Sequence, residues 1–156
     1  MKKATKMGLI ILGVVGGLAI IFVLVPLIVF RVAEPKLKDR VNKVYASEAI
    51  VFEDYKASNF GIESKGKTQQ RGNGALVLTA HELHFFQLIP NQDFRIPLDK
   101  IKKVETTRTH LGKTVGRKLL YVSYTADGVD DAVAFSVVDV DAWVAKLAPK
   151  PAENVR

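Results

Sequence analysis

The chain begins with one long apolar segment. Between Gly8 and Phe30 there is no charged residue and almost no polar one. As a helix these 23 residues would extend about 34 Å, enough to cross a hydrocarbon core of about 30 Å. We therefore predict a transmembrane helix over residues 8–30, after a basic tail over residues 1–7. The main alternative is a cleaved signal peptide, but its apolar core is typically about 7–15 residues and ends in a small-residue motif that residues 30–33 fit poorly.

A short amphipathic helix is expected next, over residues 31–46. Leu37, Val41 and Val44 recur at helical spacing among charged residues, and Pro35 suits a first helical turn. Two interpretations stay open: a spacer, which we favour, and a basic segment lying on lipid headgroups.

From residue 47 onward, apolar positions alternate with polar ones, which is typical of strands with one buried face. Residues 59–74 are rich in Gly, Lys, Ser, Gln and Asn and predict an exposed loop. Asp127-Gly128 predicts a hairpin turn. About seven strands are expected, with runs near residues 49–52, 75–79, 82–88, 94–98, 101–107, 119–125 and 133–137.

The last element changes to helical spacing. Asp139 suits an N-cap and Asp141 a first turn, and prolines at 149 and 151 end the helix before a tail over residues 149–156. Its apolar stripe consists of Val140, Trp143, Val144 and Leu147. We expect Trp143 to be buried in the core.

Three segments in this order resemble bacterial PH-like and GRAM-like domains. They are residues 74–79 (Gly-Ala-Leu-Val-Leu-Thr), 82–85 (Glu-Leu-His-Phe) and 96–104 (Ile-Pro-Leu-Asp-Lys-Ile-Lys-Lys-Val). The resemblance covers residues 47–148. It implies a split barrel of about seven antiparallel strands capped by the C-terminal helix. It also implies a binding module for lipid headgroups, peptides or self-assembly, without catalysis or a cofactor.

Charge adds a candidate surface. The net charge is +7, and 20 basic against 16 acidic residues remain after Lys2, Lys3 and Lys6 are set aside. Cations near a bilayer favour anionic headgroups. The candidate anionic-ligand patch consists of Lys65, Lys67, Arg71, Lys113, Arg117 and Lys118, and solvated, separate charges are the alternative. Lysines and arginines on both sides of residues 8–30 nearly balance, with a slight preference for a cytoplasmic domain.

The sequence gives little support for a metal site, a nucleotide-binding loop, a catalytic carboxylate pair or a nucleic-acid interface. There is no cysteine, and no third ligand accompanies His81 and His84 at a metal-binding spacing, so no metal site is expected. Gly112-Lys113-Thr114 lacks the earlier glycine of a phosphate-binding loop. The adjacent acids Glu53-Asp54 and Asp130-Asp131 are interpreted as surface charge. The basic bias is too small for a nucleic-acid partner.

The sequence therefore predicts a single-pass membrane protein carrying a binding module for anionic headgroups or a protein partner. A self-associating scaffold is the alternative, because Gly13 and Gly17 form a Gly-x-x-x-Gly pair that could let two membrane helices meet. An enzyme is a distant third.

Overall fold

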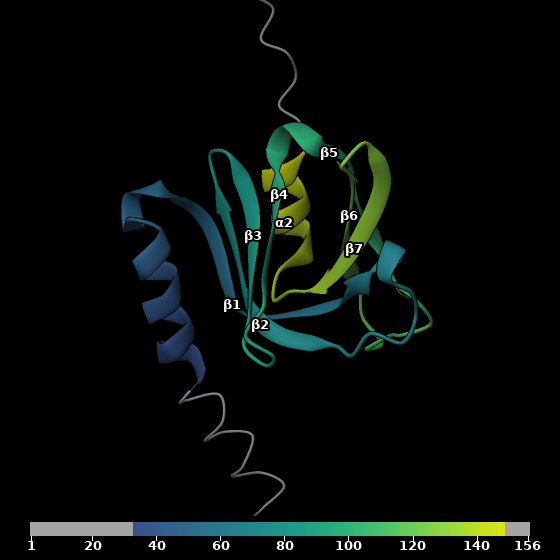
Figure 1. The fold of residues 1–156 in the computed structure, drawn as a ribbon, viewed down its shortest axis with the longest axis horizontal. Coiled ribbons are helices and arrows are strands. Elements are labelled where there is room, and N and C mark those ends of the chain that lie inside the picture. Colours follow the sequence, from purple (N-terminus) through teal and green to yellow (C-terminus); the bar gives the residue numbers. More distant parts are fainter. Residues whose placement is uncertain (1–32, 149–156) are drawn as a thin grey trace, which may run out of the picture. The chain divides into compact units, whose positions relative to one another are not determined.

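The computed structural model describes residues 33–148 (Figure 1). The predicted membrane segment 8–30, with Gly13 and Gly17, and the tails 1–7 and 149–156 lie outside the described residues. Within the described residues, no helix combines the length and apolar character needed to cross a membrane. A compact unit begins at Leu37.

Seven antiparallel strands form one sheet in the order β4-β3-β2-β1-β7-β6-β5. The first and last strands of this order, β4 and β5, are separated in the chain only by the short helix η3, so the sheet curls towards a barrel. The mainly β fold with a C-terminal helix is as predicted. The strands are β1 (Ile50–Ile62), β2 (Gly72–Thr79), β3 (Glu82–Gln87), β4 (Asp93–Pro97), β5 (Ile101–Thr107), β6 (Leu119–Ala126) and β7 (Val129–Ser136); the short helices are η1 (Ser47–Ala49), η2 (Glu63–Lys65) and η3 (Leu98–Lys100).

β1 is the strand that joins the two halves of the sheet. It pairs with β2 over most of its length and with β7 near its end, with register shifts between Asp54 and Ala57 and between Asn59 and Ile62. Such shifts bend a strand and increase its twist. One continuous, bent strand can therefore belong to both walls of the barrel.

The prediction of a loop over residues 59–74 was wrong at both ends. Residues 59–62 complete β1, and residues 72–74 begin β2. A Cβ atom on Gly74 would lie 2.1 Å from the carbonyl oxygen of Phe86, so this glycine permits close strand pairing rather than a turn. Composition alone does not separate these two uses of glycine.

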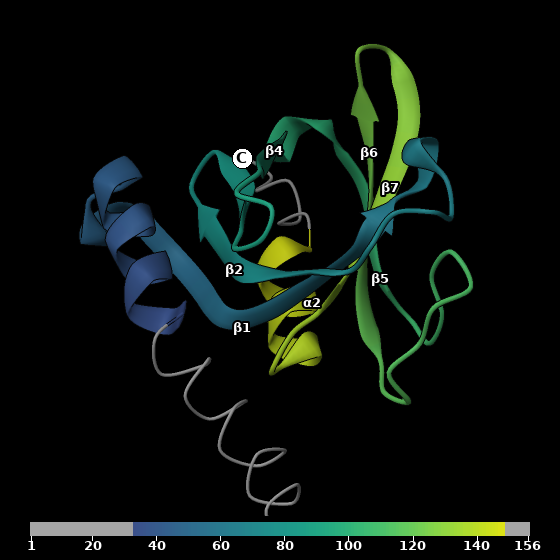
Figure 2. The same cartoon turned by 60° about the horizontal axis from the view of Figure 1, so that its bottom comes forward.

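The core is closed by α2 (Val140–Leu147), which lies within the curve of the sheet (Figures 1 and 2). The side chain of Asp139 accepts a hydrogen bond from the amide of Ala142, which confirms the predicted N-cap. Trp143 is buried and its ring lies 4.8 Å from that of Phe52. The expectation that Trp143 belongs to the core is confirmed.

A helix over residues 33–44 covers the outer face of β2 and β3. Leu37 and Val41 are buried in a cluster with Val77 and Phe86. The predicted stripe is wrong at its third position, because Val44 is 45% exposed and Tyr45 packs against this cluster instead.

Candidate functional site

A pocket of about 530 Å³ opens at one end of the barrel, between the segment 63–71 and the turn that joins β3 to β4. Four residues contribute apolar surface to it (Ile62, Ile89, Pro90 and Phe94), and four glutamines contribute neutral donors and acceptors (Gln69, Gln70, Gln87 and Gln92). The two cations among its lining residues are Lys65 and Arg71. The pocket therefore has a mixed polar and apolar lining that includes two cations.

Arg71 is held at the pocket by an aromatic ring. Its guanidinium carbon lies 4.6 Å from the centre of the Phe60 ring, and Phe60 is itself fully buried. A cation over the face of a ring is attracted by the ring quadrupole. This contact places the guanidinium group itself over the ring, while the side chain as a whole stays exposed.

Asp93 is the one carboxylate among the pocket's lining residues. Its Oδ1 lies 2.5 Å from Nη2 of Arg40 on the helix over residues 33–44, and its Oδ2 lies 3.8 Å from Nε2 of His84. Because Arg40 already balances this carboxylate, Lys65 and Arg71 remain available to an anion.

Two side chains hold the segment 63–71 in place by donating to backbone carbonyl oxygens. Nε2 of Gln69 donates to the carbonyl oxygens of Ile62 (2.6 Å) and Gly66 (2.7 Å). The ammonium group of Lys113 donates to the carbonyl oxygen of Phe60 at 3.2 Å and to that of Gln69. Lys113 is thus engaged with backbone oxygens, and its role here is to position the segment.

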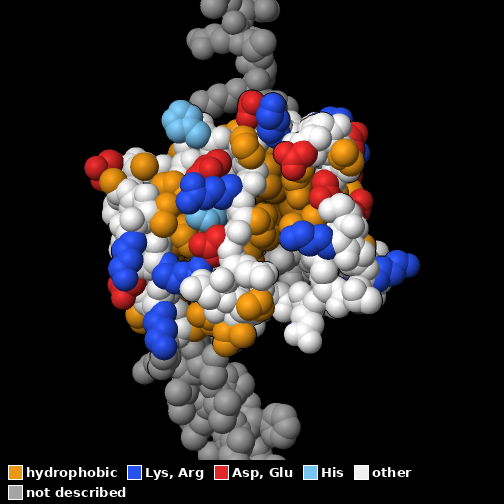
Figure 3. All heavy atoms as spheres, in the orientation of Figure 1, with side chains coloured by type: hydrophobic (Ala, Val, Ile, Leu, Met, Phe, Trp, Pro, Cys, Tyr) orange, Lys and Arg blue, Asp and Glu red, His pale blue; other side chains and the backbone are white. Residues whose placement is uncertain are grey.

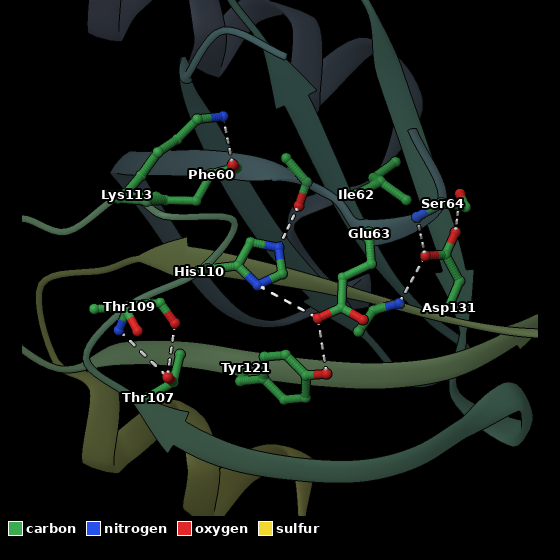
Figure 4. A network of polar contacts seen from close by, with 12 residues as sticks. Phe60, Ile62, Glu63, Ser64, Thr107, Thr109, His110, Lys113, Tyr121 and Asp131 are labelled. Carbon is green, nitrogen blue, oxygen red and sulfur yellow. Dashed lines mark hydrogen bonds and ion pairs between the residues drawn. The ribbon is translucent and has the colours of Figure 1, made fainter. Parts of the chain in front are cut away.

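A further network ties the β5–β6 loop to the same segment (Figure 4). Nε2 of the buried His110 lies 2.9 Å from the carbonyl oxygen of Gly61, and its Nδ1 lies 3.8 Å from Glu63. The hydroxyl of Tyr121 donates to Glu63 at 3.2 Å. Burial, with help from Glu63, raises the pKa of Tyr121, so this hydroxyl stays a donor.

Asp131 completes that network from β7. Its carboxylate accepts hydrogen bonds from the amide (3.0 Å) and the hydroxyl (2.6 Å) of Ser64. Burial opposes ionisation of Asp131, but the bonds from Ser64 and Ala132 lower its pKa overall. The interpretation of Asp131 as plain surface charge was therefore wrong.

The six cations of the predicted patch fall into separate places. Lys65 and Arg71 both line the pocket, and Lys67 is exposed in the same segment. Arg117 donates to the hydroxyl of Ser136 at 2.6 Å, at the end of β7. Lys118 lies 3.6 Å from Asp141 in the first turn of α2.

The cluster around His84 was missed by sequence reasoning. The hydroxyl of Tyr45 donates to Glu82 and lies 2.9 Å from Nδ1 of His84. The side chain of His84 is 1% exposed, and its Nε2 is buried without a hydrogen-bond partner among the described residues. Its hydrogen-bond partner Tyr45 lies 39 residues away in the chain, so no local spacing could reveal this contact.

No protein-family model matches this chain, and no curated protein matches it. Among residues 33–148, no group of three or more His, Asp or Glu side chains is arranged to hold a metal ion. The pocket with Lys65 and Arg71 is therefore the candidate site, argued from its own chemistry.

Proposed function

We propose that this chain is a single-pass membrane protein whose PH-like domain binds an anionic lipid headgroup in the pocket beside segment 63–71. The observation that carries the proposal is the charge of this pocket: Lys65 and Arg71 line it, while Arg40 balances its one carboxylate. A phosphate or carboxylate group in the pocket would meet two cations and several neutral amides.

The PH-like assignment is supported by the strand order. β1 to β4 follow one another along one half of the sheet, β5 to β7 along the other, and α2 lies within the curve of the sheet. This arrangement is the one expected of a split barrel capped by a C-terminal helix. The proposal of binding rests on the pocket rather than on the fold, because one fold serves many functions.

Anchoring of the chain in the membrane would make a weak affinity for the headgroup sufficient to keep the pocket occupied at the bilayer surface. The apolar segment ends at Phe30, seven residues before Leu37, where the compact unit begins. A tether of this kind turns binding of a headgroup into an intramolecular event with a high effective concentration. We therefore expect a low affinity for a headgroup free in solution.

The test uses the full chain in lipid nanodiscs, with hydrogen exchange of residues 63–71 as the readout. Exchange should be slower in discs that contain phosphatidylglycerol than in discs of phosphatidylcholine alone. Lys65→Glu with Arg71→Glu should abolish this difference. The matched control, Lys100→Glu with Lys103→Glu, reverses two exposed cations that do not line the pocket and should preserve it. A native chain that responds equally to both lipids would refute the proposal.

The alternative of a scaffold assembled through sheet edges has less support. β4 ends in Pro97, and β5 carries the exposed cations Lys102 and Lys103. Proline and lysine on edge strands are features that oppose pairing with another sheet. Association through residues 8–30 stays a prediction, since those residues lie outside the described part.

A further inference from the structure

We propose that the β3–β4 turn, residues 87–92, inserts into the headgroup region of the bilayer, with Ile89 as its apolar contact. This inference rests on the membrane anchoring proposed above. Ile89 and Pro90 also line the headgroup pocket, but insertion of the turn does not require an anion in that pocket. It assigns to the domain a fixed face towards the membrane.

Ile89 is the most exposed large hydrophobic side chain of the described residues, at 78%. Pro90 beside it is also exposed. The whole turn, Gln-Leu-Ile-Pro-Asn-Gln, has no charged side chain. Moving it among headgroups therefore removes apolar surface from water without stripping water from a charge.

The turn lies where the chain enters the compact unit. Nη1 of Arg40 donates to the carbonyl oxygen of Gln87 at 2.8 Å, and Nη2 pairs with Asp93 on the other side of the turn. Arg40 is three residues after Leu37, where the unit begins. Of the seven steps from Phe30 to Leu37, the last four lie in the helix over residues 33–44, so this part of the chain can span at most about 17 Å. A bilayer around residues 8–30 would thus be within reach of the turn.

The β6–β7 turn offers a natural contrast. Val129, directly after this turn, is 66% exposed, but the acidic residues Asp127 and Asp130 lie beside it in the chain. Figure 3 shows acidic side chains around this hairpin and mainly hydrophobic and neutral ones at the foot of the β3–β4 hairpin. Asp127 would repel anionic headgroups at the β6–β7 turn, whereas Lys65 and Arg71 line the pocket beside the β3–β4 turn.

The absence of cysteine allows a direct test. Ile89→Cys and, as the matched control, Val129→Cys are labelled with an environment-sensitive fluorophore in the full chain. Both are reconstituted in phosphatidylcholine nanodiscs, with and without lipids carrying a nitroxide near the headgroup. We expect the label at residue 89 to emit at shorter wavelength and to be quenched at least twofold, and the label at residue 129 to be unaffected. Unchanged emission of the buried Trp143 in both variants shows that the fold is intact.

Two results would overturn the inference: a label at residue 89 that is as solvated and unquenched as that at residue 129, or equal quenching of both. The lipids in this test carry no net charge, so its outcome does not depend on Lys65 or Arg71. If the native chain showed no lipid response in the hydrogen-exchange test but the label at residue 89 were still quenched, the proposal of headgroup binding in the pocket would be refuted. The proposal that the turn inserts into the bilayer would be retained.

Discussion

The imidazole of His84 lies on the outer face of β3, between Tyr45, Phe86 and Asp93. Burial is the largest effect that lowers its pKa to about 4; Arg95 and Arg40 also lower it, and Asp93 and Glu82 raise it. Because the hydroxyl proton of Tyr45 goes to Glu82, Nδ1 of a neutral His84 donates to the Tyr45 oxygen. Nε2 is then an acceptor that faces a carboxylate.

This environment predicts a loss of stability in acid. The pKa of His84 in the fold is below its ordinary value of 6.5, so its contribution is complete above pH 6.5 and is lost as the pH falls towards 4. Between pH 7.5 and 4.5 we expect a loss of about 2 kcal/mol, at about 1.4 kcal/mol per pKa unit. Urea unfolding of the full chain in detergent, followed by Trp143 fluorescence, measures it.

His84→Gln removes the titrating group and should lose that part of the acid sensitivity. His81→Gln, at an exposed position three residues earlier, should retain it. Equal pH dependence of the native chain and His84→Gln would show that other groups account for the acid response.

At the scale of elements, the helix over residues 33–44 is attached by a few buried side chains. Leu37 and Val41 are buried against β2 and β3, and Arg40 adds its bonds to the β3–β4 turn. Since an isolated helix of this length is marginal in water, its order depends on this packing. From Leu37 onward the helix is therefore part of the compact unit, and this packing argues against the interpretation as a spacer.

Leu37→Ala should destabilise the domain by about 2–4 kcal/mol, because it leaves a cavity under the helix. Val44→Ala, two turns on and 45% exposed, should change the stability by less than about 0.5 kcal/mol. Urea unfolding at pH 7.5 compares the two. If both substitutions had equal effects, the helix would not be held by its buried stripe.

Much of this element structure follows from sequence, where the signals are local. The cap at Asp139 and the hairpin at Asp127-Gly128 are confirmed, and Asp127 and Gly128 both adopt positive φ as such a turn needs. The prediction failed where a residue's partner is distant. Asp54, interpreted as surface charge, is buried and accepts from the amide of Val138 at 2.6 Å, 84 residues away. Lys65 and Arg71 belong to the predicted patch, but no pocket was predicted. The pairing of Asp93 with Arg40 could not be predicted either, because it forms only when the helix over residues 33–44 packs on the sheet.

At the scale of the whole molecule, the described domain has two dissimilar ends. One carries the pocket cations and the uncharged β3–β4 turn, and the other carries Asp127 and Asp130 near the exposed Val129. The hydrogen bond from Lys102, with its charge, lowers the pKa of Asp130, so that carboxylate stays ionised well into acid. The two proposed membrane contacts differ in physical origin. The contact of the pocket cations with headgroups is electrostatic, and the contact of Ile89 with the bilayer is hydrophobic.

Salt should therefore separate them. The Debye length falls from about 10 Å at 0.1 M to about 3 Å at 1 M salt, which screens exposed cations such as Lys65 and Arg71 from headgroups. Raising NaCl over this range should remove most of the phosphatidylglycerol-dependent protection of residues 63–71. The quenching of a label at residue 89 should change little, because transfer of apolar surface from water is not weakened by screening. If both signals fell together, the turn would be held at the bilayer by charge, and Ile89 would not act as an apolar contact of its own.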